Sequence, residues 1–392
     1  MLFDDDPAPS LITGVGRKHL DWEHFRSLFP VVNKHVYLNN AGVAPTSARV
    51  TAAIDRWVHR LASDGLLIET WLAEAEEVRC RLADFVGAFP REIAFVRNTS
   101  HGLALVAEGL DWRADDEVAV CTEIEYPSNV YPWLHLAERG VRVTEIEPVA
   151  GGVTVEAVDR AIGQRTRVLA LSAVQYASGH RADLKAIGEL CAERGVLFCV
   201  DGIQIVGAAP LDVKQLGIHF LSADGHKWML GTPGIGFLFV DESVCDRLRP
   251  VLVGWKSTTD AFNIDRTHFE LKTDASKFEE GTPAFPLIAG LGAAIGLLQE
   301  LGLEQIQARI QKLLASLENS LLAIGCQVAP EPVHRAGILT FVKPGVSCEK
   351  IFQEAESKSI RISIRRDRMR VSPHVYNNER DIERLIELVS QL

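Results

Sequence analysis

The chain has 392 residues, of which 47% are hydrophobic and 24% are charged, the balance of a globular protein large enough for two or three domains. Its formal net charge of −11 argues against a nucleic-acid-binding surface, which normally carries a basic patch. The sequence has no run of about 18 apolar residues and begins with acidic residues rather than a basic signal-peptide region, so we expect neither a membrane span nor a signal peptide.

The first two thirds of the chain predict a large α/β domain over residues 36–285, preceded by an N-terminal arm, residues 1–35. Two early helices are followed by short apolar runs that alternate with amphipathic segments, which favours a largely parallel sheet with helices on both faces. The expected helices are Ser47–Ser63, Glu69–Val86, Ser100–Gly109, Asn129–Arg139 and Leu184–Arg194. The expected strands are Ile93–Val96, Glu117–Cys121, Val141–Ile146, Arg167–Leu171, Val196–Val200, Phe220–Ser222 and Gly236–Val240.

The last third, residues 286–392, predicts a smaller C-terminal α+β domain. A long helical stretch runs to about Ile324 and is interrupted at Gly302, because glycine weakens a helix interior. The elements expected after it are the strand Ile338–Val342, the helix Cys348–Ser357, the short strands Arg361–Arg365 and Arg368–Ser372, and the helix Glu379–Leu392.

The densest group of reactive side chains lies between residues 200 and 236. Asp201 follows an apolar strand, Gln204 comes three residues later, and the next strand runs into His226 and Lys227. Ligands in open α/β folds bind at the carboxyl ends of the strands, so a carboxylate and an amine are expected to meet there. A pyridoxal-5′-phosphate (PLP) site needs this pair, because the lysine forms a Schiff base and moves a proton at the substrate Cα. The carboxylate keeps the pyridine nitrogen protonated.

Two further segments are placed where a ligand could bind. The run Arg97–Gly102 is a strand end, a polar turn and a helix start, whose free N–H groups and hydroxyls can cradle a phosphate. Thr99 and Ser100 are also ordinary helix N-caps, so this segment alone is a weak signal. The turn Glu280–Pro283 lies just before the long helix.

The segments Val200–Gln204, Gly225–Trp228 and Gly234–Gly236 resemble the class V aminotransferase family. That family includes cysteine desulfurases, isopenicillin N epimerases, kynureninases and related C–S lyases. The resemblance covers roughly residues 36–385 and implies a fold type I PLP enzyme. Supporting matches are Tyr37–Gly42, Phe95–Ala107, Glu125–Trp133, Phe278–Pro283 and Arg370–Ser372.

The resemblance implies a role for each matching residue. Lys227 would carry PLP as a Schiff base and Asp201 would pair with the pyridine N–H, which makes both catalytic. Gln204 would bind the phenolic oxygen of the ring. Desulfurases usually stack a histidine on the ring after a glutamate; here Tyr126 follows Glu125, so the chain departs from that pattern and we expect Tyr126 to stack instead. The other implied ligands are Thr99, Ser100 and His226 at the phosphate, Thr282 reaching the phosphate of the second subunit in a homodimer with shared sites, and Arg370 and Asn40 at the amino-acid substrate. Tyr176 lies at another strand end and could line the substrate pocket, although core packing would explain it equally well.

The chain departs from the desulfurase pattern near its C-terminus. Desulfurases place a nucleophilic cysteine on a loop shortly before the carboxylate-binding arginine, where a reactive thiolate is accessible. Here the run Ile360–Arg370 leaves almost no loop and holds no cysteine, and Cys348 lies 22 residues before Arg370 (370 − 348). Persulfide chemistry is therefore disfavoured. Asp224 stands where desulfurases carry serine, so we expect it to point away from the phosphate or to pair with a base.

The sequence predicts a PLP-dependent enzyme that deprotonates an amino acid at Cα, without separating epimerase, lyase and aminotransferase chemistry. One alternative is a cysteine desulfurase that uses Cys348 or another thiol. A non-catalytic PLP-binding protein is another, against which the Asp201–Lys227 pair argues. A nicotinamide-dependent enzyme is excluded because no GxGxxG opens a helix after the first strand. The arginines of the hairpin Arg361–Arg370 could bind a second acidic group on the substrate, and solvent exposure would explain them equally well.

The seven cysteines are scattered, without CxxC or Cys/His spacing. We therefore expect buried thiols in a reducing cytoplasm and no metal site. The expected partners are a small amino acid and a second copy of the chain, with no nucleic acid and no membrane.

Overall fold

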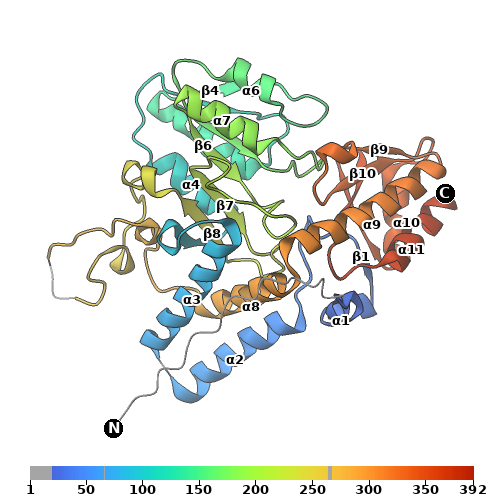
Figure 1. The fold of residues 1–392 in the computed structure, drawn as a ribbon, viewed down its shortest axis with the longest axis horizontal. Helices are drawn as coiled ribbons and strands as arrows, with labels where there is room; N and C mark the ends of the chain where they lie inside the picture. The colour runs from blue at the N-terminus through green and yellow to red at the C-terminus, as the bar shows by residue number, and fades with distance from the viewer. Residues whose placement is uncertain (1–19, 66, 264–266) are drawn as a thin grey trace, which may run out of the picture.

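The computed structural model describes residues 20–65, 67–263 and 267–392. Figure 1 shows a large part built around a central sheet and a smaller part that contains the C-terminus. The first 19 residues of the expected N-terminal arm lie outside the described residues.

The central sheet has seven strands in the order β2-β8-β7-β6-β5-β3-β4. Strand β8 is antiparallel to both of its neighbours, and the other six strands run in one direction. This architecture confirms the predicted α/β fold class. The strands are β2 (Ile93–Val96), β3 (Glu117–Val120), β4 (Arg142–Glu145), β5 (Thr166–Ser172), β6 (Leu197–Asp201), β7 (Phe220–Asp224) and β8 (Gly236–Val240).

Both faces of this sheet are buried, which explains why its strands are apolar without alternation. In β5, Val168 and Ala170 pack with helices α4 and α5, whereas Leu169 and Leu171 pack with α6 and α7 on the opposite face. These helices are α4 (Thr99–Gly109), α5 (Tyr131–His135), α6 (Val155–Ala161) and α7 (Leu184–Arg194).

Three long helices pack together beside the β2 end of the sheet (Figure 1). They are α2 (Ala48–Asp64), α3 (Ile68–Val86) and α8 (Phe285–Leu301), and α9 (Leu303–Ala323) continues from α8. The rings of Trp57, Trp71 and Phe285 meet where the three helices converge, with the two tryptophan centroids 4.7 Å apart. Within the described residues no single helix is long and apolar enough to cross a membrane; α8 and α9 meet that test only as a pair, bent by 79°.

The smaller part is a four-stranded antiparallel sheet in the order β12-β13-β10-β9, packed with α9, α10 and α11. Its elements are β9 (Gln327–Ala329), β10 (Leu339–Val342), α10 (Cys348–Ser357), β12 (Ser363–Arg365), β13 (Arg368–Val371) and α11 (Glu379–Ser390). The predicted strand 361–365 is divided in the structure, because its first residue belongs to β11 (Ile360–Arg361), which pairs elsewhere.

The start of the described chain packs against its C-terminal part. Strand β1 (Val36–Tyr37) pairs in parallel with β11, and Arg26 of α1 (Trp22–Ser27) forms an ion pair with Asp381 at 2.7 Å. The sequence pattern missed β1 and β9 because strands of two or three residues show no periodicity. The three-part division at residues 35 and 285 stays a prediction.

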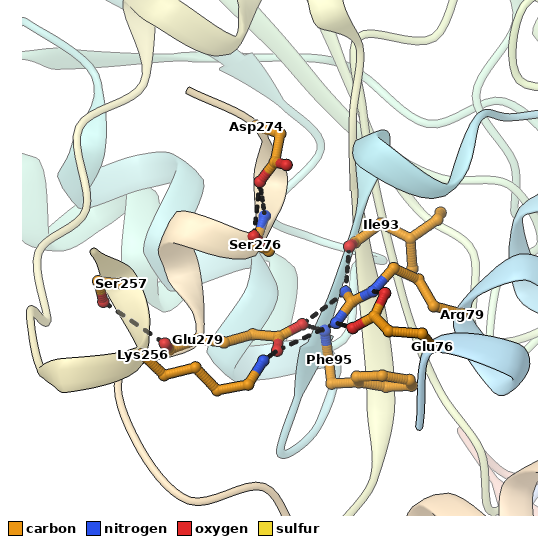
Figure 2. A network of polar contacts seen from close by, with 9 residues as sticks. All are labelled: Glu76, Arg79, Ile93, Phe95, Lys256, Ser257, Asp274, Ser276 and Glu279. Atoms are coloured by element: carbon orange, nitrogen blue, oxygen red, sulfur yellow. Dashed lines mark hydrogen bonds and ion pairs between the residues drawn. The ribbon is translucent and has the colours of Figure 1, made fainter. Parts of the chain in front are cut away.

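A buried ion network fixes the backbone just before the turn at Thr282 (Figure 2). The Glu279 carboxylate binds the Arg79 guanidinium at 2.6 Å, the Lys256 ammonium, and the backbone N–H of Phe95 at 2.9 Å. All three ionic side chains are buried, and the half-exposed Glu76 is a second anion on Arg79. Burial acts to raise the pKa of Glu279, but the two cations outweigh it and hold that pKa at about 2.

Candidate active site

A cavity of about 360 Å³ lies at the carboxyl ends of β5, β6 and β7 and is closed by residues of the β12–β13 hairpin. It adjoins the point between β3 and β5 where the strand order reverses, the usual ligand site of an open α/β sheet. Nine of the predicted site residues line it: Thr99, Ser100, Tyr126, Tyr176, Asp201, Gln204, His226, Lys227 and Arg370.

Lys227 and Asp201 face this cavity from neighbouring strands. Asp201 is the last residue of β6 and pairs in register with Ser222 of β7, and Lys227 follows in the tight turn after β7. Asp201 Oδ1 accepts a hydrogen bond from the Ile203 N–H at 3.0 Å, and its Oδ2 makes none with the described residues. Burial raises the pKa of Asp201 and lowers the pKa of Lys227. Desolvation thus brings the amine closer to its neutral, basic form.

The start of α4 fits a phosphate group. The Asn98 side chain caps the helix by accepting from the His101 N–H at 2.8 Å, which leaves the N–H groups of Thr99 and Ser100 free of helix partners. The Thr99 hydroxyl is buried and has no hydrogen-bond partner among the described residues. Such a hydroxyl beside a helix N-terminus suits an anion. The helix can approach β7 closely because residue 102 is glycine, where a Cβ would overlap the Ser222 hydroxyl.

Asp224 lies beside His226 at the cavity wall. Their nearest atoms, Asp224 Oδ1 and His226 Nδ1, are 3.0 Å apart, although they lack the alignment of a hydrogen bond. Asp224 is therefore placed next to a base, one of the two arrangements that the sequence predicted for it.

The predicted ring-binding residues also converge on the cavity. The Tyr126 ring packs edge-to-face on Tyr176 at 5.1 Å, and Lys227 Nζ lies 5.9 Å from the Tyr126 centroid. The Gln204 Oε1 accepts from the Trp228 indole N–H at 2.8 Å, and its Nε2 donates to the Ala41 carbonyl at 3.1 Å. The second N–H of Gln204 Nε2 is left free to donate to a ligand, as a bond to a phenolic oxygen requires. The residues present therefore fit PLP.

Arg370 enters the cavity from the smaller part of the molecule. Its guanidinium donates to Ser363 Oγ at 3.2 Å, to the Tyr176 carbonyl at 2.7 Å and to Asn39 Oδ1 at 3.4 Å. It is 1% exposed, and burial together with Arg365 lowers its pKa to about 9. An unpaired buried cation is costly, so an incoming carboxylate would be favoured.

Two predicted residues lie outside this cavity. Asn40 is fully buried, and its Oδ1 accepts from the Tyr376 hydroxyl at 3.0 Å, so its neighbour Asn39 contacts Arg370 instead. The role of Asn40 at the substrate stays a prediction. Thr282 lines a separate cavity with Arg97 and His101.

Glu125, a buried acid with no predicted role, is bonded to the cavity-lining residue Ser172. Its Oε1 accepts from the Ser172 N–H at 2.7 Å and from Gln175 Nε2 at 2.8 Å, and its Oε2 accepts from Asn129 Nδ2 at 3.1 Å. These bonds hold the loop after β3 against the end of β5. Ser128, Ser172 and Arg365 also line the cavity. Only the position of Ser172 at the end of an apolar strand could have indicated its place from sequence.

No cysteine is among the described residues that line the cavity. Cys348 is buried at the start of α10, where its thiol donates to the Asp367 carbonyl at 3.2 Å. Burial and the adjacent Glu349 raise its pKa, so the reactive thiolate is disfavoured.

The described part of the chain has no cluster of three or more His, Cys, Asp or Glu side chains placed to hold a metal ion.

The chain is similar in sequence to a family model and to curated proteins. Residues 36–385 match the family model described as Aminotransferase class-V. A probable cysteine desulfurase of Methanothermobacter thermautotrophicus is 32% identical over 326 residues, which is 81% of this chain and 80% of that protein. The uncharacterized aminotransferase YcbU of Bacillus subtilis is 28% identical and covers 94% of this chain and 97% of its own length.

Solved structures share the whole fold. Apo cysteine desulfurase from Thermococcus onnurineus NA1 superimposes with a TM-score of 0.86 at 26% identity, covering 94% of this chain and 97% of that one. The cystine C–S lyase C-DES, in complex with its reaction product cysteine persulfide, superimposes with a TM-score of 0.87 at 25% identity, covering 93% of this chain and 99% of that one.

Proposed function

Because the chain belongs to the class V aminotransferase family, whose members are PLP enzymes acting on amino acids, we propose that Lys227 removes the Cα proton of its substrate and that no protein thiol takes part. The observation that carries this proposal is the shared cavity of Lys227 and Asp201, whose described lining holds no cysteine.

When bound, PLP supplies an electron-accepting ring that stabilises negative charge at the Cα of an attached amino acid. Asp201, whose Oδ2 is free of other described partners, would keep the ring nitrogen protonated. Lys227 would take the Cα proton on its Nζ and return it, since burial lowers its pKa towards the range of a useful base.

The remaining residues would bind and orient. Thr99, Ser100 and His226 would hold the phosphate, while Gln204 and Tyr126 would contact the ring. Arg370 would bind the α-carboxylate through two N–H groups, which fixes the direction in which the Cα–H bond points.

The named activities of the relatives favour cleavage of a C–S bond. The absence of a cysteine from the described cavity lining favours a lyase over a desulfurase. The C-DES structure is that of a cystine C–S lyase, whereas the Methanothermobacter relative is named a probable cysteine desulfurase. A desulfurase would need a thiol at the substrate, and Cys348 is held away from the cavity by its bond to Asp367. Elimination is therefore proposed over persulfide formation; epimerisation and transamination begin with the same proton loss.

The shared first step can be measured without knowing the product. Cys348→Ala should exchange the Cα hydrogen of a responsive amino acid with D₂O solvent within about 2-fold of the wild-type rate, because the thiol is not at the site. Proton NMR of an amino-acid panel would follow the exchange, with pyruvate, ammonia, oxo acid and enantiomer assayed in the same samples. Loss of exchange or of sulfur release in this variant would contradict the proposal and favour a desulfurase.

We also propose a homodimer with shared active sites. Thr282 lies outside the Lys227 cavity of its own chain, which is the arrangement expected if it reaches the phosphate bound by a second chain. Sedimentation equilibrium should therefore give twice the chain mass of 43.2 kDa, and a single-chain mass at micromolar concentration would count against shared sites.

A cytoplasmic location is proposed because all seven cysteines are free, six of them buried.

A further inference from the structure

Two guanidinium groups, rather than one, face the substrate side of the cavity. Arg365 and Arg370 both line it, and both act electrostatically on Lys227. Neither forms an ion pair with a carboxylate among the described residues: Arg370 contacts a hydroxyl, a carbonyl and an amide oxygen, and Arg365 donates only to the Ile364 carbonyl at 2.7 Å.

The other arginines of the hairpin region are bound within the protein. Arg361 forms an ion pair with Glu356, Arg366 donates to the Glu123 carbonyl, and Arg368 donates to Thr340 Oγ1 at 3.0 Å. Arg365 itself is half-buried, so exposure of its side chain to solvent does not explain why an arginine stands at this position.

The hairpin places the two cations on the same face. Residues Arg366 and Asp367 have φ values of 46° and 61°, as a two-residue turn of type I′ requires. Ser363 lies directly opposite Arg370 in the β12–β13 register, and Arg365 is two residues from Ser363, so all three project from one side of the sheet.

The acids of the cavity do not neutralise these cations. Asp201 is at the end of β6 with Lys227 as its nearby cation, and Asp224 lies beside His226. Two like charges that share a partly dehydrated cavity repel each other, and an entering anion would relieve this repulsion.

We propose that the substrate is an amino acid whose side chain carries a second carboxylate, with the α-carboxylate on Arg370 and the side-chain carboxylate on Arg365. This inference rests on the proposed function and names the substrate class of the same site. A planar carboxylate on each guanidinium would form paired N–H···O bonds, for which arginine geometry is suited.

The test compares isosteric pairs of amino acids on the PLP-loaded enzyme. The pairs are L-aspartate with L-asparagine and L-glutamate with L-glutamine, and the apparent Kd comes from the change in cofactor absorbance. Arg365→Gln should weaken the acidic member of the preferred pair by about 10- to 100-fold and its neutral partner by less than about 3-fold, the loss expected for one charge-assisted contact. Arg361→Gln, with the same change of charge outside the cavity, should alter neither member.

A second variant and two alternative results complete the test of Arg365. Arg365→Lys should recover part of the affinity for the acidic member, while an unchanged absorbance spectrum shows that the variants are folded and loaded. Equal weakening of both members would mean that Arg365 shares the α-carboxylate, and an unchanged Kd would mean that it binds no substrate; either overturns the proposal. A wild-type chain that binds no PLP would instead overturn the proposed function, and this is seen before any amino acid is added.

Discussion

Replacing Lys227 by alanine is expected to remove Cα–H exchange almost completely, by at least about 1,000-fold, together with the cofactor that borohydride would otherwise fix to the protein. Loss of a positioned base alone costs about 100- to 10,000-fold, and here the attachment point is lost as well. No other lysine is among the described residues that line the cavity, so none there can substitute. The measurements are exchange by NMR and the mass of borohydride-treated peptides.

Lys185, an exposed residue of α7, provides the matched control. Lys185→Ala should retain wild-type exchange and the same labelled peptide containing Lys227. A Lys227→Ala protein that still carries a borohydride-fixed cofactor at another lysine would show that the central assignment is wrong.

Replacing Glu279 by glutamine is expected to lower the free energy of unfolding by about 3–5 kcal/mol, because it leaves the buried Arg79 and Lys256 without their shared anion. Glu76→Gln removes a half-exposed carboxylate from the same arginine and should cost less than about 1 kcal/mol. Urea unfolding at one fixed protein concentration would compare the three proteins. Equal midpoints for Glu279→Gln and wild type would show that the network in Figure 2 does not stabilise the fold.

The Glu279 carboxylate should also make the stability of the fold depend on pH in the acidic range. Its pKa is depressed from an ordinary value of 4.5 to about 2, so its contribution is fully present above pH 4.5 and is lost as the pH falls towards 2. Wild-type stability should therefore fall more steeply than that of Glu279→Gln between pH 4.5 and pH 2. Parallel curves in this range would indicate that Glu279 titrates normally in the folded protein.

Much of the site could be predicted from sequence because two local rules apply to it. Apolar strands with polar residues at their carboxyl ends mark the ligand edge of an α/β sheet, and Asp201 and Lys227 both lie at such ends. The strand–turn–helix pattern at Thr99 is also local, and so is the absence of a loop in the hairpin before Arg370. The resemblance of these segments to one family then linked residues that no local rule connects.

The sequence by itself thus determined the fold class, the positions of Lys227 and Asp201 at strand ends, and the lack of a cysteine-bearing loop before Arg370. Only the tertiary structure decided that Asn39 rather than Asn40 contacts Arg370, and that Glu125 is bonded to Ser172 at the cavity. It also showed that Arg365 faces the cavity with no acidic partner among the described residues. It also brought Arg79 to Glu279 across 200 residues of chain. Contacts of this kind depend on how separate elements pack, whereas periodicity reports only which face of its own helix or strand a residue occupies.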